Sequence, residues 1–301
     1  LISLVLILST IGIETNKFNN LISKKINQSN SNINLELTTI KFKLDIEEIS
    51  LFLETDNPQI NYLKTSIPAK KIKVYIDFIS LLKSKPKIKK INLSLNELDI
   101  EELKKISVTF KPSNFTSFLN NKIKQGMVNI KLEIYLDNKN SLDSFIAKGS
   151  VSNLKAEIIK NVNIEKTNFS FFADKSDILL KNISSKTGAI TITEGDLKLK
   201  LSPEISLESS FKTNLKYDQK LMGYENLIKK FNNIKDVVNI EAKLKNNFFI
   251  NFDETYKVKN YNYKSNGVIL KGNFEFKNPL EKIFFEKKIN QLSLTNSKIK
   301  T

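Results

Sequence analysis

Apolar and polar residues alternate with period two through most of this chain. The pattern is clearest in the segments INLELTTIKFKLDI, KIKVYIDFI, KKINLSLNELDI, VNIKLEIYLD and AITITEGDLKLKLS. Such alternation is typical of strands that turn one sheet face to an apolar medium and the other to water. We therefore expect a mainly β protein with a few helices, built on a long antiparallel sheet that curls into a groove.

Short connections carrying Asp, Asn, Ser, Gly or Pro separate the expected strands, as hairpin turns do. The strands are expected at residues 33–46, 49–54, 72–78, 91–95, 128–136, 145–151, 154–159, 168–172, 178–183, 189–193, 197–201, 205–217, 238–244, 248–252, 268–270, 274–276 and 289–299. The first of these changes parity after Thr38 and Thr39, which indicates a bulge or bend inside one long strand.

Four helices are expected between the strands. Asp99 is a plausible cap for IEELKKI, in which acids come early and lysines late, as the helix dipole favours. Ser113 is expected to cap a second helix that ends at Gly126. Its apolar stripe consists of Phe115, Phe118, Leu119 and Ile123. Apolar spacings of three and four predict a third helix over residues 221–237, and Asn278-Pro279 predicts the start of a fourth.

The first residues differ from the rest, because residues 1–13 are almost purely apolar. This run is shorter than the ~20 residues that span a bilayer, so we expect a truncated transmembrane anchor. A signal-peptide core and a buried core segment are the alternatives. Residues 14–29 are expected to form an amphipathic helix, with Phe18, Leu21, Ile22 and Ile26 opposite Lys24 and Lys25. That helix either caps the sheet or lies at a membrane surface.

Residues 30–301 are expected to form one β-rich domain. Since the chain begins inside a hydrophobic segment and ends within an expected strand, we expect it to be a fragment of a longer protein.

The amino-acid composition excludes several kinds of catalytic and binding site. The chain has no His and no Cys, which excludes Ser-His-Asp and Cys-His catalysis, disulfides and His- or thiolate-based zinc sites. Its net charge of +16 comes from lysine without any arginine. Arginine is the preferred residue for recognising phosphate and guanine, so its absence argues against sequence-specific nucleic-acid binding. The lysines are expected on a solvated outer face, with attraction to anionic lipid as the functional alternative.

Paired carboxylates occur at Glu47-Glu48, Glu101-Glu102 and Asp253-Glu254, each at a strand edge or helix start among lysines. We interpret them as solvated charges. We therefore expect no catalytic residue, no metal site, no cofactor and no enzymatic activity.

The apolar face is the remaining candidate site. Three arrangements would use it: a sandwich would bury it against a second sheet, an outer-membrane barrel would turn it outward to lipid, and a curled sheet would line a groove with it. The groove is favoured, because Trp is missing, an anchor is expected and several strands are long. The expected lining residues are Leu35, Leu37, Val128, Ile130, Leu132, Ile134, Leu136, Ile190, Ile192, Leu197, Leu199, Leu207, Phe211 and Leu215. Ordinary core packing explains each of these residues equally well.

Several segments carry a family resemblance. The apolar start, the amphipathic segment and INLELTTIKFKLDIEEISLFLETDNPQI resemble the N-terminal region of AsmA-like proteins. KIKKINLSLNELDIEELKKI resembles their recurrent strand and short helix. SFIAKGSVSNLKAEI, FSFFADKSDILLKNI and AITITEGDLKLKL resemble later strands of AsmA-like and DUF3971-type proteins. The resemblance covers most of the chain through loose hydrophobic patterns.

This resemblance implies an inner-membrane-anchored protein of Gram-negative bacteria, with most of its chain in the periplasm. Such a protein is expected to bind phospholipid in its β-groove and to aid phospholipid transport and outer-membrane biogenesis. Its expected partners are phospholipid, the inner membrane and outer-membrane or other envelope proteins, without nucleic acid. The alternatives are an envelope assembly scaffold that carries no lipid and an outer-membrane β-barrel.

Overall fold

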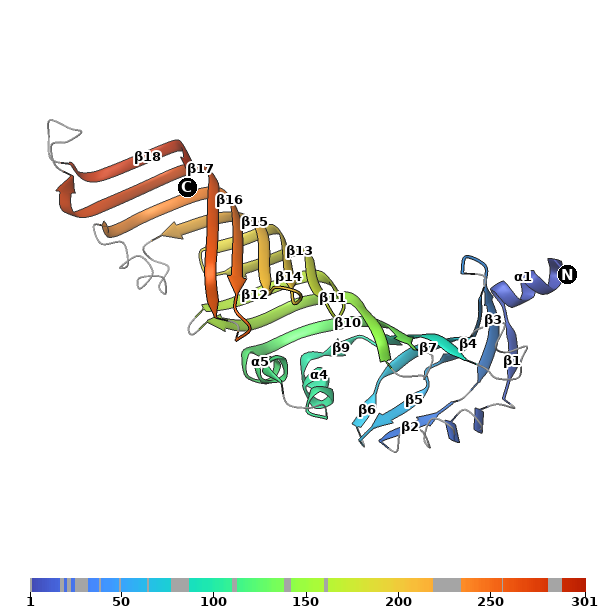
Figure 1. Cartoon of the computed structure of the whole chain (residues 1–301). Helices are drawn as coiled ribbons and strands as arrows, with labels where there is room; N and C mark the ends of the chain where they lie inside the picture. The colour runs from blue at the N-terminus through green and yellow to red at the C-terminus, as the bar shows by residue number, and fades with distance from the viewer. Residues whose placement is uncertain are drawn as a thin grey trace. The chain divides into compact units, whose positions relative to one another are not determined.

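Most regular elements of the computed structural model are β-strands (Figure 1). The structure describes residues 2–16, 19–20, 23–24, 32–37, 39–48, 50–63, 65–76, 87–109, 113–137, 142–159, 162–218, 234–255, 257–280 and 289–301. The expectation of a mainly β protein with a few helices is thus confirmed. The chain divides into two units: unit 1 is Leu1–Val151 with Phe171–Lys175, and unit 2 is Ser152–Ser170 with Ser176–Thr301.

One large antiparallel sheet of 15 strands dominates the structure. Its hydrogen-bonded order is β1-β3-β4-β7-β8-β10-β11-β12-β13-β14-β15-β16-β17-β18, with β9 paired to β10. From β10 onward each strand pairs with its neighbour in sequence, as the hairpin-like connections predict. A separate three-stranded sheet has the order β2-β5-β6.

Unit 1 contains helices α1, α4 and α5 and the small sheet. Its elements are α1 (Ile2–Thr10), β1 (Ile13–Thr15), β2 (Ile33–Glu36), β3 (Ile40–Asp45), β4 (Ser50–Asp56), β5 (Gln59–Tyr62), β6 (Thr65–Ile67), β7 (Ala69–Ile76), β8 (Ile88–Leu95), β9 (Leu98–Asp99), α4 (Ile100–Ser107), α5 (Asn114–Lys122), β10 (Ile123–Leu136) and the first part of β11 (Leu142–Ile159). The bend expected near Thr38 is instead a change of sheet, because β2 belongs to the small sheet and β3 to the large one.

Helices α4 and α5 form as the sequence predicts. The Asp99 carboxylate accepts from the Glu102 N–H, and the Glu102 carboxylate accepts from the Asp99 N–H, which completes a capping box. The Ser113 hydroxyl likewise accepts from the Thr116 N–H. The expected end of α5 at Gly126 is wrong: α5 ends at Lys122, and the extended residue Ile123 already begins β10.

The N-terminal helix is shorter than expected and does not continue into a second helix. Helix α1 ends at Thr10, and Gly12, with a φ of 81°, donates from its N–H to the Ile7 carbonyl in a Schellman-type cap. Residues 13–15 then pair with β3 as strand β1, so the helix expected from residue 14 is wrong at its start. Asn19, Asn20, Ser23 and Lys24 are helical, whereas Phe18, Leu21, Ile22, Lys25 and Ile26 lie outside the described residues. No helix in the described ranges has the length and hydropathy to cross a membrane.

Unit 2 is a meander of long antiparallel strands. It contains the rest of β11, most of β12 (Val162–Ala173), and then β13 (Asp177–Thr187), β14 (Ile190–Lys200), β15 (Ser206–Asp218), β16 (Ile234–Phe252), β17 (Val258–Leu280) and β18 (Ile289–Lys300). Residues 221–233 of the third expected helix lie outside the described residues, but residues 234–237 belong to β16. Asn278 belongs to β17, so no helix begins there.

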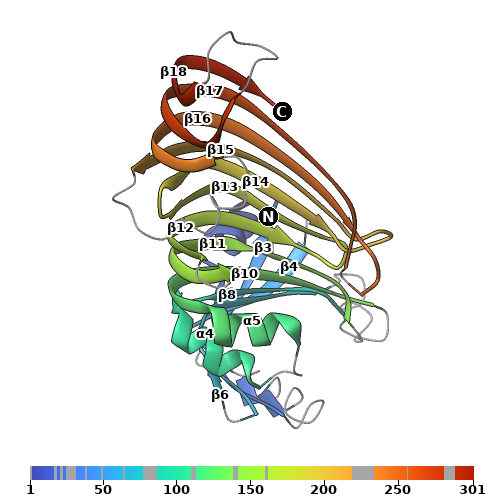
Figure 2. The same ribbon diagram turned by 90° about the vertical axis from the view of Figure 1, so that its left-hand side faces the viewer.

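Bulges explain why these strands are longer than expected. The expected break near residue 195 is a bulge inside β14, where the register with β15 shifts between Ile192 and Glu194. Asn153 in β11 and Asn182 in β13 have φ values of 52° and 55°, and the pairing of β13 with β14 is interrupted between Leu180 and Ser185. A bulge bends its strand and moves the following apolar residues to the other parity. Figure 2 shows β13 to β17 as bent strands that run side by side.

Candidate functional site

The register gives the sheet of unit 2 one apolar and one polar face. Directly paired residues share a face, so successive pairings trace rows across the strands. The first apolar row is Ile178, Leu199, Leu207, Ile250 and Tyr261; the second is Leu180, Leu197, Ser209, Phe248 and Tyr263; a further row is Thr187, Ile190, Leu215, Ala242 and Ile269. The intervening residues on the opposite face are mostly Lys, Asn, Ser and acids.

Small and polar residues lie between these apolar rows, where the strands bend. We call this band the crease: it comprises Ile183, Gly195, Phe211, Asn246 and Ser265, and beside them Ser185, Ile192, Thr213, Leu244 and Gly267. A Cβ at Gly195 would lie 2.4 Å from the Phe211 ring. A Cβ at Gly267 would lie 2.0 Å from the Lys243 carbonyl oxygen. Glycine therefore permits the close approach of neighbouring strands at the crease.

A hydrogen-bonded cluster occupies the crease. The Asn246 amide donates to the Thr213 hydroxyl at 2.9 Å, and its oxygen accepts from the hydroxyls of Tyr263 and Ser265, each at 2.9 Å. Thr167 and Ser185 form a second hydroxyl pair at 2.7 Å. Asn246 and Ser265 are only 7% and 5% exposed, so these bonds satisfy polar groups that water does not reach.

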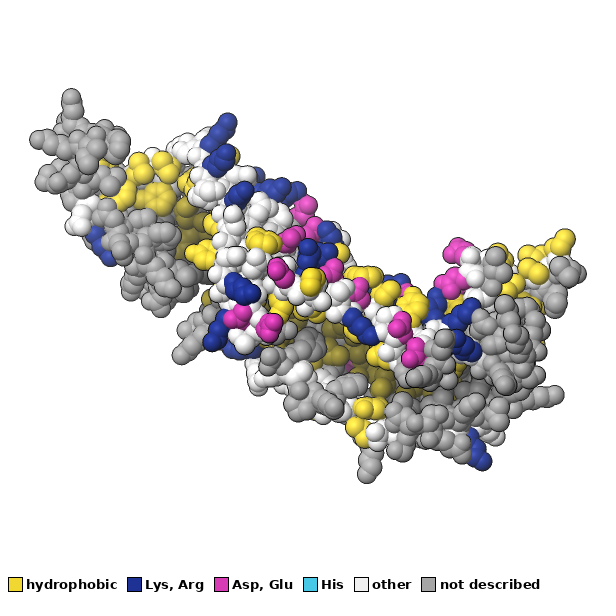
Figure 3. All heavy atoms as spheres, viewed as in Figure 1, with side chains coloured by type: hydrophobic (Ala, Val, Ile, Leu, Met, Phe, Trp, Pro, Cys, Tyr) yellow, Lys and Arg dark blue, Asp and Glu magenta, His cyan; other side chains and the backbone are white. Residues whose placement is uncertain are grey.

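Nothing in the described part of unit 2 forms a second layer over the apolar face, since all its regular elements are strands of the large sheet. At the crease, however, Ile183, Ser185, Gly195, Asn246 and Ser265 are buried and the other residues are half-buried, which places this face on the inside of the bend. Farther out, Phe248, Tyr261 and Tyr263 are 37%, 75% and 43% exposed. In Figure 3, charged side chains are scattered over the side of unit 2 that faces the viewer, with only a few hydrophobic ones among them, and more hydrophobic side chains show beyond its edge.

Unit 1 has an apolar face of its own, part of which is covered. Ala69, Leu95 and Leu98 form one buried cluster, against which Leu103 and Ile106 of α4 pack. Ile100, Leu119 and Val128 form another, with Leu119 supplied by α5. The helices thus close this face over the start of β10. Farther along β10, Leu132 lies opposite Leu93 and Ile134 opposite Ile91, and all four are half-buried.

The expected lining residues fall into three environments. Ile190, Ile192, Leu197, Leu199, Leu207, Phe211 and Leu215 share the apolar face of unit 2, where the bulge in β14 brings both halves of that strand onto one side. Ile130, Leu132, Ile134 and Leu136 are half-buried on β10, while Val128 is buried beneath α4 and α5. Leu35 is buried in the small sheet opposite Ile60, and Leu37 follows β2.

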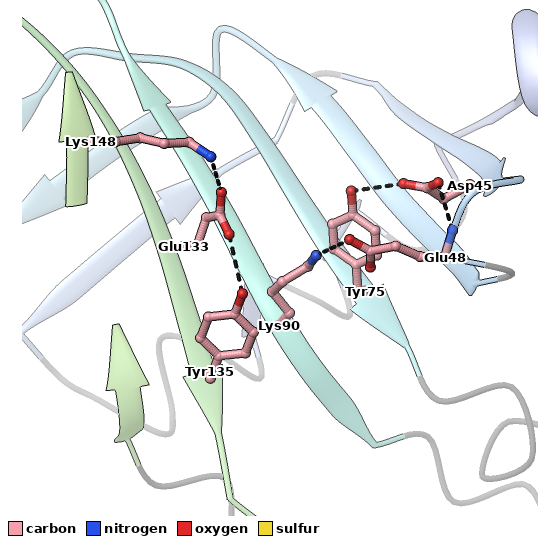
Figure 4. Close-up of polar contacts among 7 residues, drawn as sticks. All are labelled: Asp45, Glu48, Tyr75, Lys90, Glu133, Tyr135 and Lys148. Carbon is pink, nitrogen blue, oxygen red and sulfur yellow. Dashed lines mark hydrogen bonds and ion pairs between the residues drawn. The ribbon is translucent and has the colours of Figure 1, made fainter. Parts of the chain in front are cut away.

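The polar face of unit 1 carries a network of ionisable groups (Figure 4). The Tyr75 hydroxyl donates to Asp45 at 3.3 Å, and Lys90 donates to Glu48. Burial, and then the charges of Asp45 and Glu48, raise the pKa of Tyr75 far above its ordinary value. The hydrogen bond from Lys148 lowers the pKa of Glu133. Both shifts move titration away from neutral pH: Tyr75 stays protonated and neutral, and Glu133 stays ionised. These two groups are therefore not poised for proton transfer near neutral pH.

Sequence reasoning missed the polar residues of the crease. Asn246 and Ser265 lie among apolar neighbours on their face and resemble turn residues. In the structure the Ser265 hydroxyl donates directly to the Asn246 side chain, which also bonds Tyr263 and Thr213. The sequence signal that could have found Asn246 is its spacing: Leu244, Asn246 and Phe248 alternate with other residues and therefore lie on the same face of one strand.

Comparison of the chain with protein-family models, with curated proteins and with solved structures gives no significant match. The geometry of the apolar face is therefore the main evidence for function.

Proposed function

We propose that the apolar face of unit 2 binds the acyl chains of phospholipid. The observation that carries this proposal is the apolar rows of β13 to β17, over which the described residues place no second layer. Each CH₂ group that leaves water for such a surface contributes up to about 0.8 kcal/mol. The charged head group would remain in water, while the lysine-rich opposite face keeps the protein soluble around its cargo.

The same proposal includes a cellular role. As its resemblance to AsmA-like proteins implies, the protein would be held at the inner membrane by its N-terminal region and extend into the periplasm. There it would aid phospholipid movement towards the outer membrane. The half-buried residues Leu132 and Ile134 of unit 1 would provide further contacts for acyl chains.

The test is mass spectrometry of lipid that copurifies with the full chain after gentle extraction. Leu207 lies between Leu199 and Ile250 on the apolar face, and a carboxylate there would stand where acyl chains bind. Leu207→Asp should therefore lose most of the bound lipid. Ser210→Asp is the matched control, because it adds the same charge to the same strand on the opposite face.

We expect stoichiometric diacyl phospholipid on the wild-type protein and on Ser210→Asp. Circular dichroism and amide hydrogen exchange establish that Leu207→Asp is folded. Equal lipid on a folded Leu207→Asp protein would overturn the proposal. A stable, monodisperse and lipid-free wild-type protein would do so as well, and would favour an envelope assembly scaffold.

A further inference from the structure

The polar face of unit 2 carries its charges unevenly. Four ion pairs lie on β11 to β15: Lys155–Glu165, Lys181–Asp196, Lys198–Asp177 and Lys212–Glu194. On the following strands, Lys243, Lys245, Lys298 and Lys300 are exposed and form no ion pair within the described residues. Positive charge is therefore concentrated on the polar side of β15 to β18.

The register brings these lysines together. One row across the strands is Glu194, Lys212, Lys245, Asn266 and Lys300; the next is Asn214, Lys243, Val268 and Lys298. Neighbouring strands are about 4.8 Å apart, and successive rows on one face are about 6.8 Å apart. Lys212 and Lys245 face each other directly, and like charges in that position destabilise a sheet. Glu194 pairs with Lys212 at 2.5 Å and offsets its charge, whereas Lys243 and Lys245 have no such carboxylate partner within the described residues.

An open hollow of about 330 Å³ lies at the same place. Its lining comprises Thr193, Lys212, Thr213, Asn214, Lys243, Leu244, Lys245, Asn266 and Gly267. Thr193 is the extra residue of the bulge in β14, so the irregularity that bends the strand also contributes to the hollow. Lys212, Asn214, Lys243, Lys245 and Asn266 lie on the polar face. Thr213, Leu244 and Gly267 belong to the crease on the opposite face, so only their backbone can line the hollow. No lining residue is a carboxylate or an aromatic ring.

The residues that line this hollow favour one chemical class of ligand. The ammonium groups of Lys243 and Lys245, which form no ion pair within the described residues, suit an oxyanion together with the amide donors of Asn214 and Asn266. Lysine is a common phosphate ligand that acts as a point charge. The absence of carboxylates from the lining disfavours cations, and the absence of aromatic rings disfavours the stacking of bases. We propose that this hollow, which we call the lysine hollow, binds a phosphate-bearing group.

The lysine hollow lies on the face opposite the acyl-binding rows, so this proposal is independent of the proposed function. The phosphate can belong to a soluble molecule or to a lipid head group. Two probes distinguish these sources: pyrophosphate, measured by titration calorimetry, and phosphatidylglycerol vesicles, measured by cosedimentation against phosphatidylcholine vesicles.

The test variant is the double substitution Lys243→Gln, Lys245→Gln in the full chain. Its control is Lys264→Gln, Lys271→Gln, which removes the same charge from β17 on the same face but outside the lining. At low ionic strength, where charges are least screened, the test variant should bind the probe about tenfold more weakly, or about 1.4 kcal/mol. The control should change affinity by less than about twofold.

Weakening of pyrophosphate binding confined to the test variant would identify a site for a soluble phosphate compound. Weakening confined to the test variant with phosphatidylglycerol vesicles would identify a lipid head-group site. Equal weakening in both variants would show a diffuse charge effect and overturn the proposal. The absence of binding to both probes would also overturn it.

Discussion

The hydrogen-bonded cluster at the crease predicts that replacing Asn246 strongly lowers the free energy of unfolding. Asn246→Ala removes three hydrogen bonds, to Thr213, Tyr263 and Ser265, each worth about 1 kcal/mol net. Tyr263 is 43% exposed and can turn to water, whereas Ser265 is 5% exposed and loses the bond that its hydroxyl donates to Asn246. We therefore expect Asn246→Ala to lower the free energy of unfolding by about 3 kcal/mol.

A double-mutant cycle tests this reasoning. When Ser265→Ala is added to Asn246→Ala, the orphaned hydroxyl disappears, so the double variant should be less destabilised than the sum of the single variants by about 1–2 kcal/mol. Urea unfolding followed by circular dichroism measures the free energies, and amide hydrogen exchange locates the loss in β15 to β17. Asn247→Ala, the next residue on the opposite face, serves as the control and should cost less than about 0.5 kcal/mol. A cost for Asn246→Ala below about 1 kcal/mol, or an additive cycle, would refute the assigned role of the cluster.

Three further predictions concern other elements. Gly267→Ala should separate β16 from β17, because the new Cβ would lie 2.0 Å from a backbone oxygen; we expect a loss of more than about 2 kcal/mol, and an unchanged melting temperature would contradict it. Burial raises the pKa of Glu54, but Lys43 at 2.8 Å and Lys71 at 3.3 Å outweigh it and lower the pKa overall. Glu54 should therefore stabilise the fold at neutral pH and lose this effect as pH falls below about 4.3 through its folded pKa. Glu54→Gln should flatten the acid decline of the urea midpoint between about pH 6 and 3, and an identical decline would argue against this. Asp99→Ala should remove the capping box of α4 and cost about 1 kcal/mol, with faster hydrogen exchange in α4; unchanged exchange would exclude a role for the cap.

Alternation along the chain predicted which faces of the strands are apolar. Leu132 and Ile134 on β10 pair with Leu93 and Ile91 of β8, as a common parity requires. The start of α4 was equally predictable, because Asp99 and Glu102 form a local motif that needs no distant partner.

Strand lengths were not predictable in the same way. A bulge reverses parity inside one strand, and sequence reasoning interprets that reversal as a turn between two strands. Asn153 and Asn182 look like turn residues, yet each donates its bulge N–H to a side chain of the next strand, Asn168 in one case and Asp196 in the other. These partners are 15 and 14 residues away, so local propensity cannot reveal them.

The candidate site was predicted only in outline. Its apolar rows follow from parity, but the lysine hollow depends on strand register and on the bulge at Thr193. Register is set by the pairing of whole strands, so it cannot be predicted from the local sequence around Lys243 or Lys245.

The sequential pairing of β12 to β18 has a consequence for how such a protein changes over evolution. Each strand in this series contacts its two sequence neighbours, so stability builds up along the sheet as it does in a repeat array. Duplication of one hairpin adds two antiparallel strands together and loss of one removes two, and either change leaves the direction and the facing of the remaining strands unchanged. The sheet can therefore be lengthened or shortened in steps of one hairpin, while its apolar and polar faces keep the same sides.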